Sequence, residues 1–198
     1  MIVEGILLGF LLGLGARLLF KKRPRRLGFF TGPVDLPGLW LSLLGGLVFL
    51  LVVNFIGYFP QELGQGLLRH FGLLHGILLF LMGIGFFIGG RAPGKVLAGL
   101  GFFMNGLVVL INGKMPVDLA LLARLGQEEK AQLILENRVL THGPMAGSRL
   151  GFLGDGLAYD PWWREALLMS PGDIFIGLGL MFMVFQMLVT WRKESEND

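Results

Sequence analysis

The sequence predicts an all-α protein, a polytopic membrane helix bundle of about five transmembrane helices. Of its 198 residues, 54% are hydrophobic and 16% are charged, and the mean hydropathy is +0.68. A water-soluble domain of this size has too small a core to bury so much apolar surface. Long apolar stretches and an uneven distribution of basic residues between the connecting segments support the same fold class.

Apolar segments of roughly 17 to 25 residues are needed to cross a hydrocarbon core of about 30 Å. Segments of about this length run over residues 2–20, 36–59, 71–90, 96–111 and 174–191. Because the fourth is the shortest, we expect Asn112 or the residues before Val96 to extend it. The chain therefore divides into a four-helix region (1–112), a connecting segment (113–172), and a fifth helix with its tail (173–198).

Basic residues set the expected orientation. The first apolar span is followed, not preceded, by the run KKRPRR, which is the reverse of a secretory signal peptide and predicts a retained helix with its N-terminus outside. Alternation then makes residues 21–35, 91–95 and 192–198 cytoplasmic, with nine Lys or Arg in 27 residues. Residues 60–70 and 113–172, expected outside, hold seven in 71. This direction agrees with the positive-inside rule and predicts a cytoplasmic C-terminus.

The 113–172 segment is expected to be extracytoplasmic and to fold over the bundle as short interfacial helices. Its patterns predict helices over Asp118–Leu125, Gln127–Leu140 and Trp162–Met169. Gly126 separates the first two of these. Ser170 and Pro171 then begin the final span, because serine caps a helix N-terminus and proline fixes φ in its first turn.

Composition excludes several kinds of site. The chain has no Cys, so it forms no disulfide and offers no thiolate to a metal or a substrate. The net charge of +3 follows from membrane topology, and no nucleic-acid partner is expected. His142, Asp155 and Asp160 match no metal-ligand spacing, and we assign no metal. A haem on His75 would need a second histidine at membrane depth. The sequence requires no cofactor.

Glycines recur every four residues on one face of the first span, at Gly5, Gly9 and Gly13. Gly72 and Gly76 repeat this spacing in the third span. Small residues at this spacing let helices approach closely within a membrane. We therefore predict tight packing of both helices inside the bundle, with a moving or dimerising interface as the alternative.

Polar residues cluster toward the outer ends of the predicted helices. The candidates for ligand binding are Asn54, His75, Asn105, Asn112, Lys114 and Asp173. The first three share one depth on three helices, and the others lie just above it. In the resulting outer-leaflet pocket Lys114 would attract an anionic head group, His75 would exchange a proton, and the two deeper Asn residues would fix orientation. In the alternative interpretation, Asn54 and Asn105 hydrogen-bond across helices, and Asn112 with Gly113 is an ordinary helix C-terminus.

Three short motifs carry a resemblance to a known family. They are Asn112–Val117, Leu153–Asp155 and Ser170–Asp173. With them the chain resembles a family of small bacterial multi-pass membrane proteins that is known only as a domain of unknown function. The resemblance implies a location in the bacterial cytoplasmic membrane. It implies no activity.

The sequence is compatible with three functions. The first is a non-catalytic accessory or structural subunit of a membrane complex, which contacts lipid and another membrane protein or a second copy of itself. It is favoured because ion pathways usually need charged residues within the membrane, and these spans have few. The second is an outer-leaflet binder or enzyme for a lipid, a quinone or a lipid-linked substrate. The third is a small transporter acting as an oligomer, although no internal repeat supports it. The sequence favours no catalytic activity.

Overall fold

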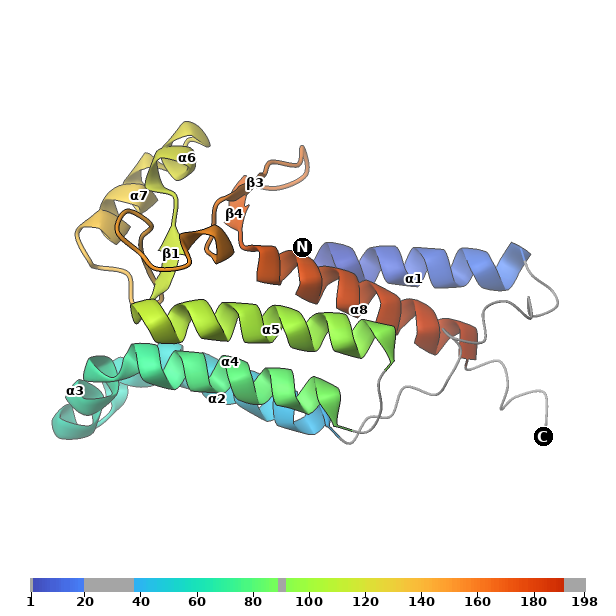
Figure 1. Cartoon of the computed structure of the whole chain (residues 1–198), viewed down its shortest axis with the longest axis horizontal. Helices are drawn as coiled ribbons and strands as arrows, with labels where there is room; N and C mark the ends of the chain where they lie inside the picture. The colour runs from blue at the N-terminus through green and yellow to red at the C-terminus, as the bar shows by residue number, and fades with distance from the viewer. Residues whose placement is uncertain (1, 20–37, 89–91, 191–198) are drawn as a thin grey trace.

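A computed structural model describes residues 2–19, 38–88 and 92–190 and shows a mostly helical protein (Figure 1). The long helices are α1 (Ile2–Leu19), α2 (Leu39–Phe55), α4 (Phe71–Phe87), α5 (Pro93–Asn112) and α8 (Pro171–Thr190). Each predicted apolar segment overlaps one of them. Helix α5 extends past the predicted fourth span at both ends, to Pro93 and Asn112, so the expected extension is confirmed.

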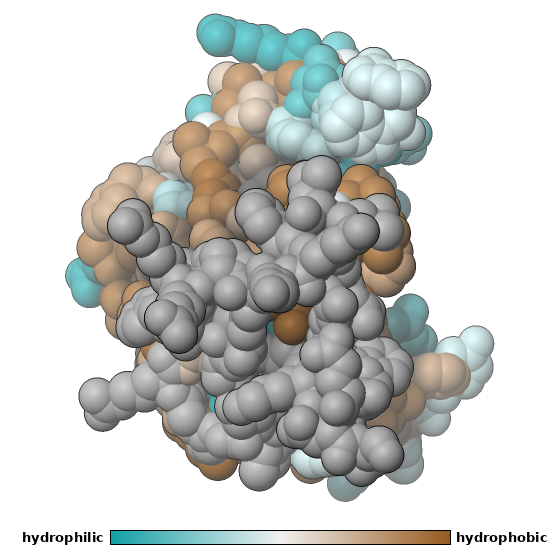
Figure 2. Space-filling view, turned by 90° about the vertical axis from the view of Figure 1, so that its right-hand side faces the viewer, coloured by the Kyte–Doolittle hydropathy of each residue, from teal (hydrophilic) through white to brown (hydrophobic). Residues whose placement is uncertain are grey.

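The long helices pack in the order α2, α4, α5, α8 and α1 (Figure 1). Helix α4 packs against α2 and α5, helix α5 against α8, and α8 against α1. Many large apolar side chains on these helices stay exposed, among them Leu11, Leu43, Leu50 and Leu73. In Figure 2 hydrophilic residues gather at the top, where Figure 1 places the 113–172 segment, and much of the surface below it that is not grey is hydrophobic. So large an apolar surface is typical of contact with lipid or with another protein.

Two helices of the described chain are long and apolar enough to cross a membrane, namely α5 and residues Pro171–Val189 of α8. A third span results if α3 (Gln61–Arg69) and α4, which meet at a bend of 70°, are counted as one. Shorter apolar stretches run over Glu4–Ala16 and Trp40–Phe55. A membrane location is therefore plausible, with two to three candidate spans by length and composition.

Helix α3 lies in a region that the sequence analysis treated as a connection. It follows a single 3-10 turn, η2 (Ile56–Tyr58), and has an acidic residue, Glu62, in its first turn and Arg69 in its last. These charges complement the helix dipole. His70 ends α3 and precedes α4, with φ −109° and ψ 16°, so the bend occurs at this residue.

The 113–172 segment contains both short helices and short strands (Figure 1). They are β1 (Met115–Val117), α6 (Leu119–Arg124), α7 (Glu128–Leu135), β2 (His142–Pro144), the 3-10 turn η3 (Gly151–Leu153), β3 (Leu157–Tyr159) and β4 (Leu167–Met169). Strands β1 and β2 pair in parallel, whereas β3 and β4 are antiparallel. The all-α prediction missed these two small sheets.

The two predicted helices around Gly126 are confirmed as α6 and α7, although α7 is shorter than expected. Gly126 and Asn137 follow their C-terminal ends with φ of 76° and 60°. After α6 the Gln127 N–H donates to Leu122 O, and after α7 the Arg138 N–H donates to the Leu133 carbonyl. Both ends are therefore Schellman caps, in which a left-handed residue satisfies the last carbonyls.

The predicted helix over Trp162–Met169 is wrong. Leu167–Met169 forms β4 and pairs with β3, so that Leu157 lies opposite Met169. A short apolar run has no periodicity that separates helix from strand. The backbone partner supplied by β3 decides the structure here.

Two apolar clusters hold the 113–172 segment in place. Val117, Leu122, Ala131 and Ile134 join β1, α6 and α7 in one of them. In the other, Val108 and Val109 of α5 pack with Met115 of β1, and Leu150 and Leu153 pack against them. The segment thereby covers the C-terminal end of α5.

Candidate functional site

A buried polar network joins the end of α5 to the start of α8. The Asn105 amide donates to Asp173 Oδ1 at 2.8 Å, and the Ser170 hydroxyl donates to Asn105 Oδ1 at 2.8 Å. The Asp173 N–H donates to Ser170 Oγ at 3.0 Å, and the Ser170 N–H donates to Asp173 Oδ2 at 3.1 Å. This reciprocal pair is a capping box and confirms the predicted cap of α8. A Cβ on Gly172 would lie 2.1 Å from Asn105 Oδ1, so the network needs glycine there.

Asp155 ties β1 to the loop before β3. Its N–H donates to Pro116 O at 2.8 Å, and the Asp118 N–H donates to Asp155 O at 3.0 Å. The His142 Nε2 atom lies 3.4 Å from Asp155 Oδ2. Burial raises the pKa of the Asp155 carboxyl, although His142 beside it acts in the opposite direction.

Asn112 and Lys114 flank the C-terminal cap of α5. The Asn112 amide donates to Val108 O and to Arg149 O, each at 2.8 Å, and its Oδ1 accepts from the Arg149 N–H at 2.8 Å. The Lys114 ammonium donates to Asn137 Oδ1 at 2.8 Å and to the Val139 carbonyl. Burial lowers the pKa of Lys114.

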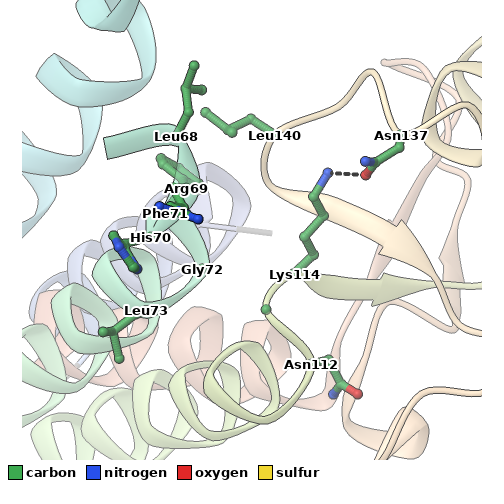
Figure 3. Close-up of a pocket in the computed structure, with 11 residues that line it drawn as sticks. Leu68, Arg69, His70, Phe71, Gly72, Leu73, Asn112, Lys114, Asn137 and Leu140 are labelled. Carbon is green, nitrogen blue, oxygen red and sulfur yellow. Dashed lines mark hydrogen bonds between the residues drawn. The ribbon is translucent and has the colours of Figure 1, made fainter. Parts of the chain in front are cut away.

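A pocket of about 470 Å³ lies between the α3–α4 bend and the loop after α5 (Figure 3). One wall is formed by residues 68–73 and the other by Asn112, Gly113, Lys114, Asn137 and Leu140. Its lining carries the cations of Arg69 and Lys114 and the imidazole of His70, and none of its described residues is acidic. Neither Arg69 nor His70 forms an ion pair with any residue that the structure describes. The pocket is therefore electropositive.

Local backbone geometry builds this pocket. Gly113 has φ of 78° and turns the chain out of α5 in the left-handed conformation, as predicted from the sequence. A Cβ on Gly72 would lie 2.1 Å from Gly113 O, so glycine at this position lets the start of α4 approach the cap of α5. That approach brings Arg69 and His70 opposite Lys114. Asn137 reaches Lys114 because it too adopts the left-handed conformation.

The structure places the six predicted ligand-binding residues at different contacts. Asn112 and Lys114 line the pocket. Asn105 and Asp173 meet each other at the α5–α8 contact. Asn54 is exposed, and its amide donates to Leu50 O at 2.8 Å within its own helix.

His75 faces α2. Its ring centroid lies 4.7 Å from that of Phe49 in a stacked arrangement, and its buried Nδ1 has no hydrogen-bond partner among the described residues. Thus Asn54, His75 and Asn105 have separate neighbours. Arg69, His70 and Asn137 were not among the predicted site residues, although Arg69 and His70, just before the third span, were a usable signal.

The predicted packing glycines lie at helix contacts. An added Cβ would lie 2.4 Å from Gly177 O at Gly5, and 2.3 Å from Met181 O at Gly9. At Gly13 it would lie 2.8 Å from a Leu188 side-chain carbon. At Gly76 it would lie 2.4 Å from the Leu110 side chain. Helix α1 therefore contacts α8, and α4 contacts α5, through bare backbone.

Within the described residues, no three His, Cys, Asp or Glu side chains are grouped so that they could hold a metal ion. The arrangement that remains is a cationic pocket beside the ends of candidate membrane helices. By its fold and its site, the protein is a helical protein with candidate membrane spans and a cationic pocket.

Residues 34–185 match DUF5317, a family of unknown function, and the chain belongs to this family. The expected resemblance is confirmed. The matched range contains every residue of the pocket, whereas α1 precedes it. No curated protein and no solved structure matches the chain.

Proposed function

We propose that this chain crosses the bacterial cytoplasmic membrane five times, with its N-terminus and the 113–172 segment outside and its C-terminus in the cytoplasm. The apolar character of α1, α2, α4, α5 and α8 supports five spans. The basic residues of the segments 21–35, 91–95 and 192–198 support the orientation.

A chain without Cys permits a direct test of this topology by introduced cysteines. In intact cells an impermeant maleimide should label Glu129→Cys, at an exposed position of α7. It should label Ser195→Cys only after the membrane is permeabilised. The opposite pattern would invert the topology.

We further propose that the protein binds a phosphate or carboxylate group at its outer surface, in the pocket of Arg69, His70 and Lys114. The observation that carries this proposal is the position of Lys114, opposite Arg69 and His70 across one pocket (Figure 3). Asn137 and Val139 accept two of the three ammonium donors, which leaves the third for a ligand. A cation with fixed partners loses little freedom on binding an anion, and hydrogen bonds between charged groups are strong.

Binding of inorganic phosphate to the purified full-length protein in a neutral detergent tests this function. Lys114→Met should weaken phosphate binding at least tenfold, because it removes a partly buried cation. Lys130→Met is a matched control, since Lys130 is exposed on α7 and does not line the pocket. Equal phosphate affinity in the two variants would refute the assignment.

The pH dependence provides an independent readout. Burial lowers the pKa of Lys114 below its ordinary value of 10.5, and only the ammonium form attracts an anion. Phosphate affinity should therefore fall as the pH rises through this lowered pKa. The fall should be absent in Lys114→Met.

A second candidate function is the accessory subunit of a membrane complex. The observation that favours it is the tip of the β3–β4 hairpin, where Trp162 is 92% exposed and Trp163 is 55% exposed. Arg164 fixes this hairpin to α1 through Glu4, with Nη1 3.0 Å from Oε1. Tryptophan is common at the centres of protein interfaces. If a protein partner co-purifies in mild detergent, Trp162→Ala should reduce its recovery, and unchanged recovery would count against this function.

A further inference from the structure

An apolar groove of about 410 Å³ adjoins the cationic pocket. Five apolar side chains of α3 and α4 line it, together with Gly66. They are Leu63, Leu67, Leu73, Leu74 and Ile77. His70 and Leu73 line both the groove and the pocket, so the two spaces meet at the α3–α4 bend.

We propose that the α3–α4 groove holds the hydrocarbon chain of the molecule whose anionic group lies in the pocket, so that the ligand is an anionic membrane lipid. This inference rests on the proposed function and names its ligand class. The cationic pocket with Lys114 would bind the phosphate or carboxylate. The apolar chain joined to this group would pass His70 and enter the groove, so the polar and apolar parts of the ligand match the pocket and the groove in order. Each space has a volume typical of small-molecule sites.

The exposure of the groove supports a lipid rather than a soluble anion. Leu63 is 54% exposed, Leu73 is 56% exposed and Ile77 is 44% exposed. A hydrocarbon chain in the groove would cover this apolar surface, which gives a favourable contribution to binding that grows with the area covered. A soluble anion would leave it uncovered.

Charge along α3 fixes the direction of the ligand. Glu62 lines the groove and is the one acidic residue of α3, whereas Arg69 lines the pocket. Arg69 comes seven positions after Glu62, which corresponds to about 10 Å along a helix. The anionic group is therefore expected at the Arg69 end, beside Lys114, and the chain extends away from it.

Gly66 offers a variant that fills the groove. Gly66 lines the groove, and no heavy atom lies within 4 Å of a Cβ added at this glycine, so the side chain of Gly66→Leu starts in open space beside the groove. Gly15→Leu is the matched control, because a Cβ on Gly15 of α1 also meets nothing within 4 Å. Gly66→Ala adds a single methyl group and should give a smaller effect.

Three probes separate the head group from the chain. Glycerol 3-phosphate carries the phosphate alone, 1-oleoyl lysophosphatidic acid adds one acyl chain, and monoolein has the chain without phosphate. Binding of each to the full-length protein in neutral detergent is measured by native mass spectrometry. We expect the lysophosphatidic acid to bind at least tenfold more tightly than either other probe.

Gly66→Leu should lose this tenfold advantage and keep its affinity for glycerol 3-phosphate, while Gly15→Leu binds all three probes like the unchanged protein. If Gly66→Leu is unstable, Gly66→Ala should show a partial loss of lysophosphatidic acid binding. Undiminished lysophosphatidic acid binding by a folded Gly66 variant would overturn the groove assignment and leave the phosphate pocket intact. Undiminished glycerol 3-phosphate binding by Lys114→Met would instead refute the pocket itself.

Discussion

Replacing Gly9 by alanine should loosen the contact between α1 and α8, and the structure sets the size of the effect. The added Cβ would lie 2.3 Å from Met181 O, whereas real Cβ atoms keep at least 3.0 Å from such atoms. The two backbones must therefore separate locally by at least 0.7 Å. Overpacking of this kind costs about 1–3 kcal/mol. Replacing glycine in a helix gains up to about 1 kcal/mol in helix propensity.

Gly15→Ala isolates the packing term, because it lies on the same helix and its added Cβ meets nothing within 4 Å. Both variants gain the same helix propensity, so Gly9→Ala should be about 1–3 kcal/mol less stable than Gly15→Ala. At about 2–4 °C for each kcal/mol in a chain of this length, thermal unfolding in detergent resolves the difference. Gly9→Leu should be less stable still and should disturb assembly. Equal melting temperatures for the two alanine variants would refute the packing argument.

Three further predictions concern the other contacts. Asn105→Leu should lower the unfolding free energy by about 1.5–3 kcal/mol, because the carboxylate of Asp173 loses the hydrogen bond that the Asn105 amide donates to it. Denaturant unfolding measures this change, and an unchanged midpoint would contradict it. The pKa of Asp155 is raised in the folded protein. The Asp155 carboxyl therefore contributes fully to stability below its pKa in the unfolded chain, near 3.8, and this contribution is lost as the pH rises through its pKa in the folded protein. Asp155→Asn should remove that slope from melting temperatures measured between pH 4 and 8, and an identical slope in both proteins would exclude the assignment. Gly126→Ala should cost about 1–2 kcal/mol although space is free around it, because φ is +76° there; equal stability would show that the cap relaxes.

Much of the fold could be predicted because it depends on local chemistry. Apolar length predicted the long helices, and Gly126, Gly113 and Ser170 predicted where helices end or begin. Each of these residues acts within a few positions of the chain, through a left-handed φ or a capping hydrogen bond. The structure confirms all three ends.

The small sheets could not be predicted in this way. Leu167–Met169 is a strand because Leu157–Tyr159 lies beside it, and Met115–Val117 is a strand because His142–Pro144 pairs with it. Three-residue runs have no measurable periodicity. Their structure depends on a partner distant in the sequence.

In the candidate site, too, the sequence predicted local properties but not which side chains meet. Depth along predicted helices placed Asn54, His75 and Asn105 in one layer, but depth does not fix the rotation of a helix about its axis. Tertiary packing turns Asn105 toward Asp173 of α8 and His75 toward Phe49 of α2. Side chains at one depth consequently have different neighbours.

The sequence by itself determined that this is a helical chain with apolar spans and determined where most of its helices end, because those properties depend on residues within one or two turns. Only the tertiary structure decided which polar groups meet. Lys114 lies opposite Arg69 because Gly72 lets α4 approach the cap of α5. Asn137 reaches Lys114 because α6 and α7 pack on β1. These contacts join segments far apart in the chain, and their geometry depends on packing that no local pattern encodes.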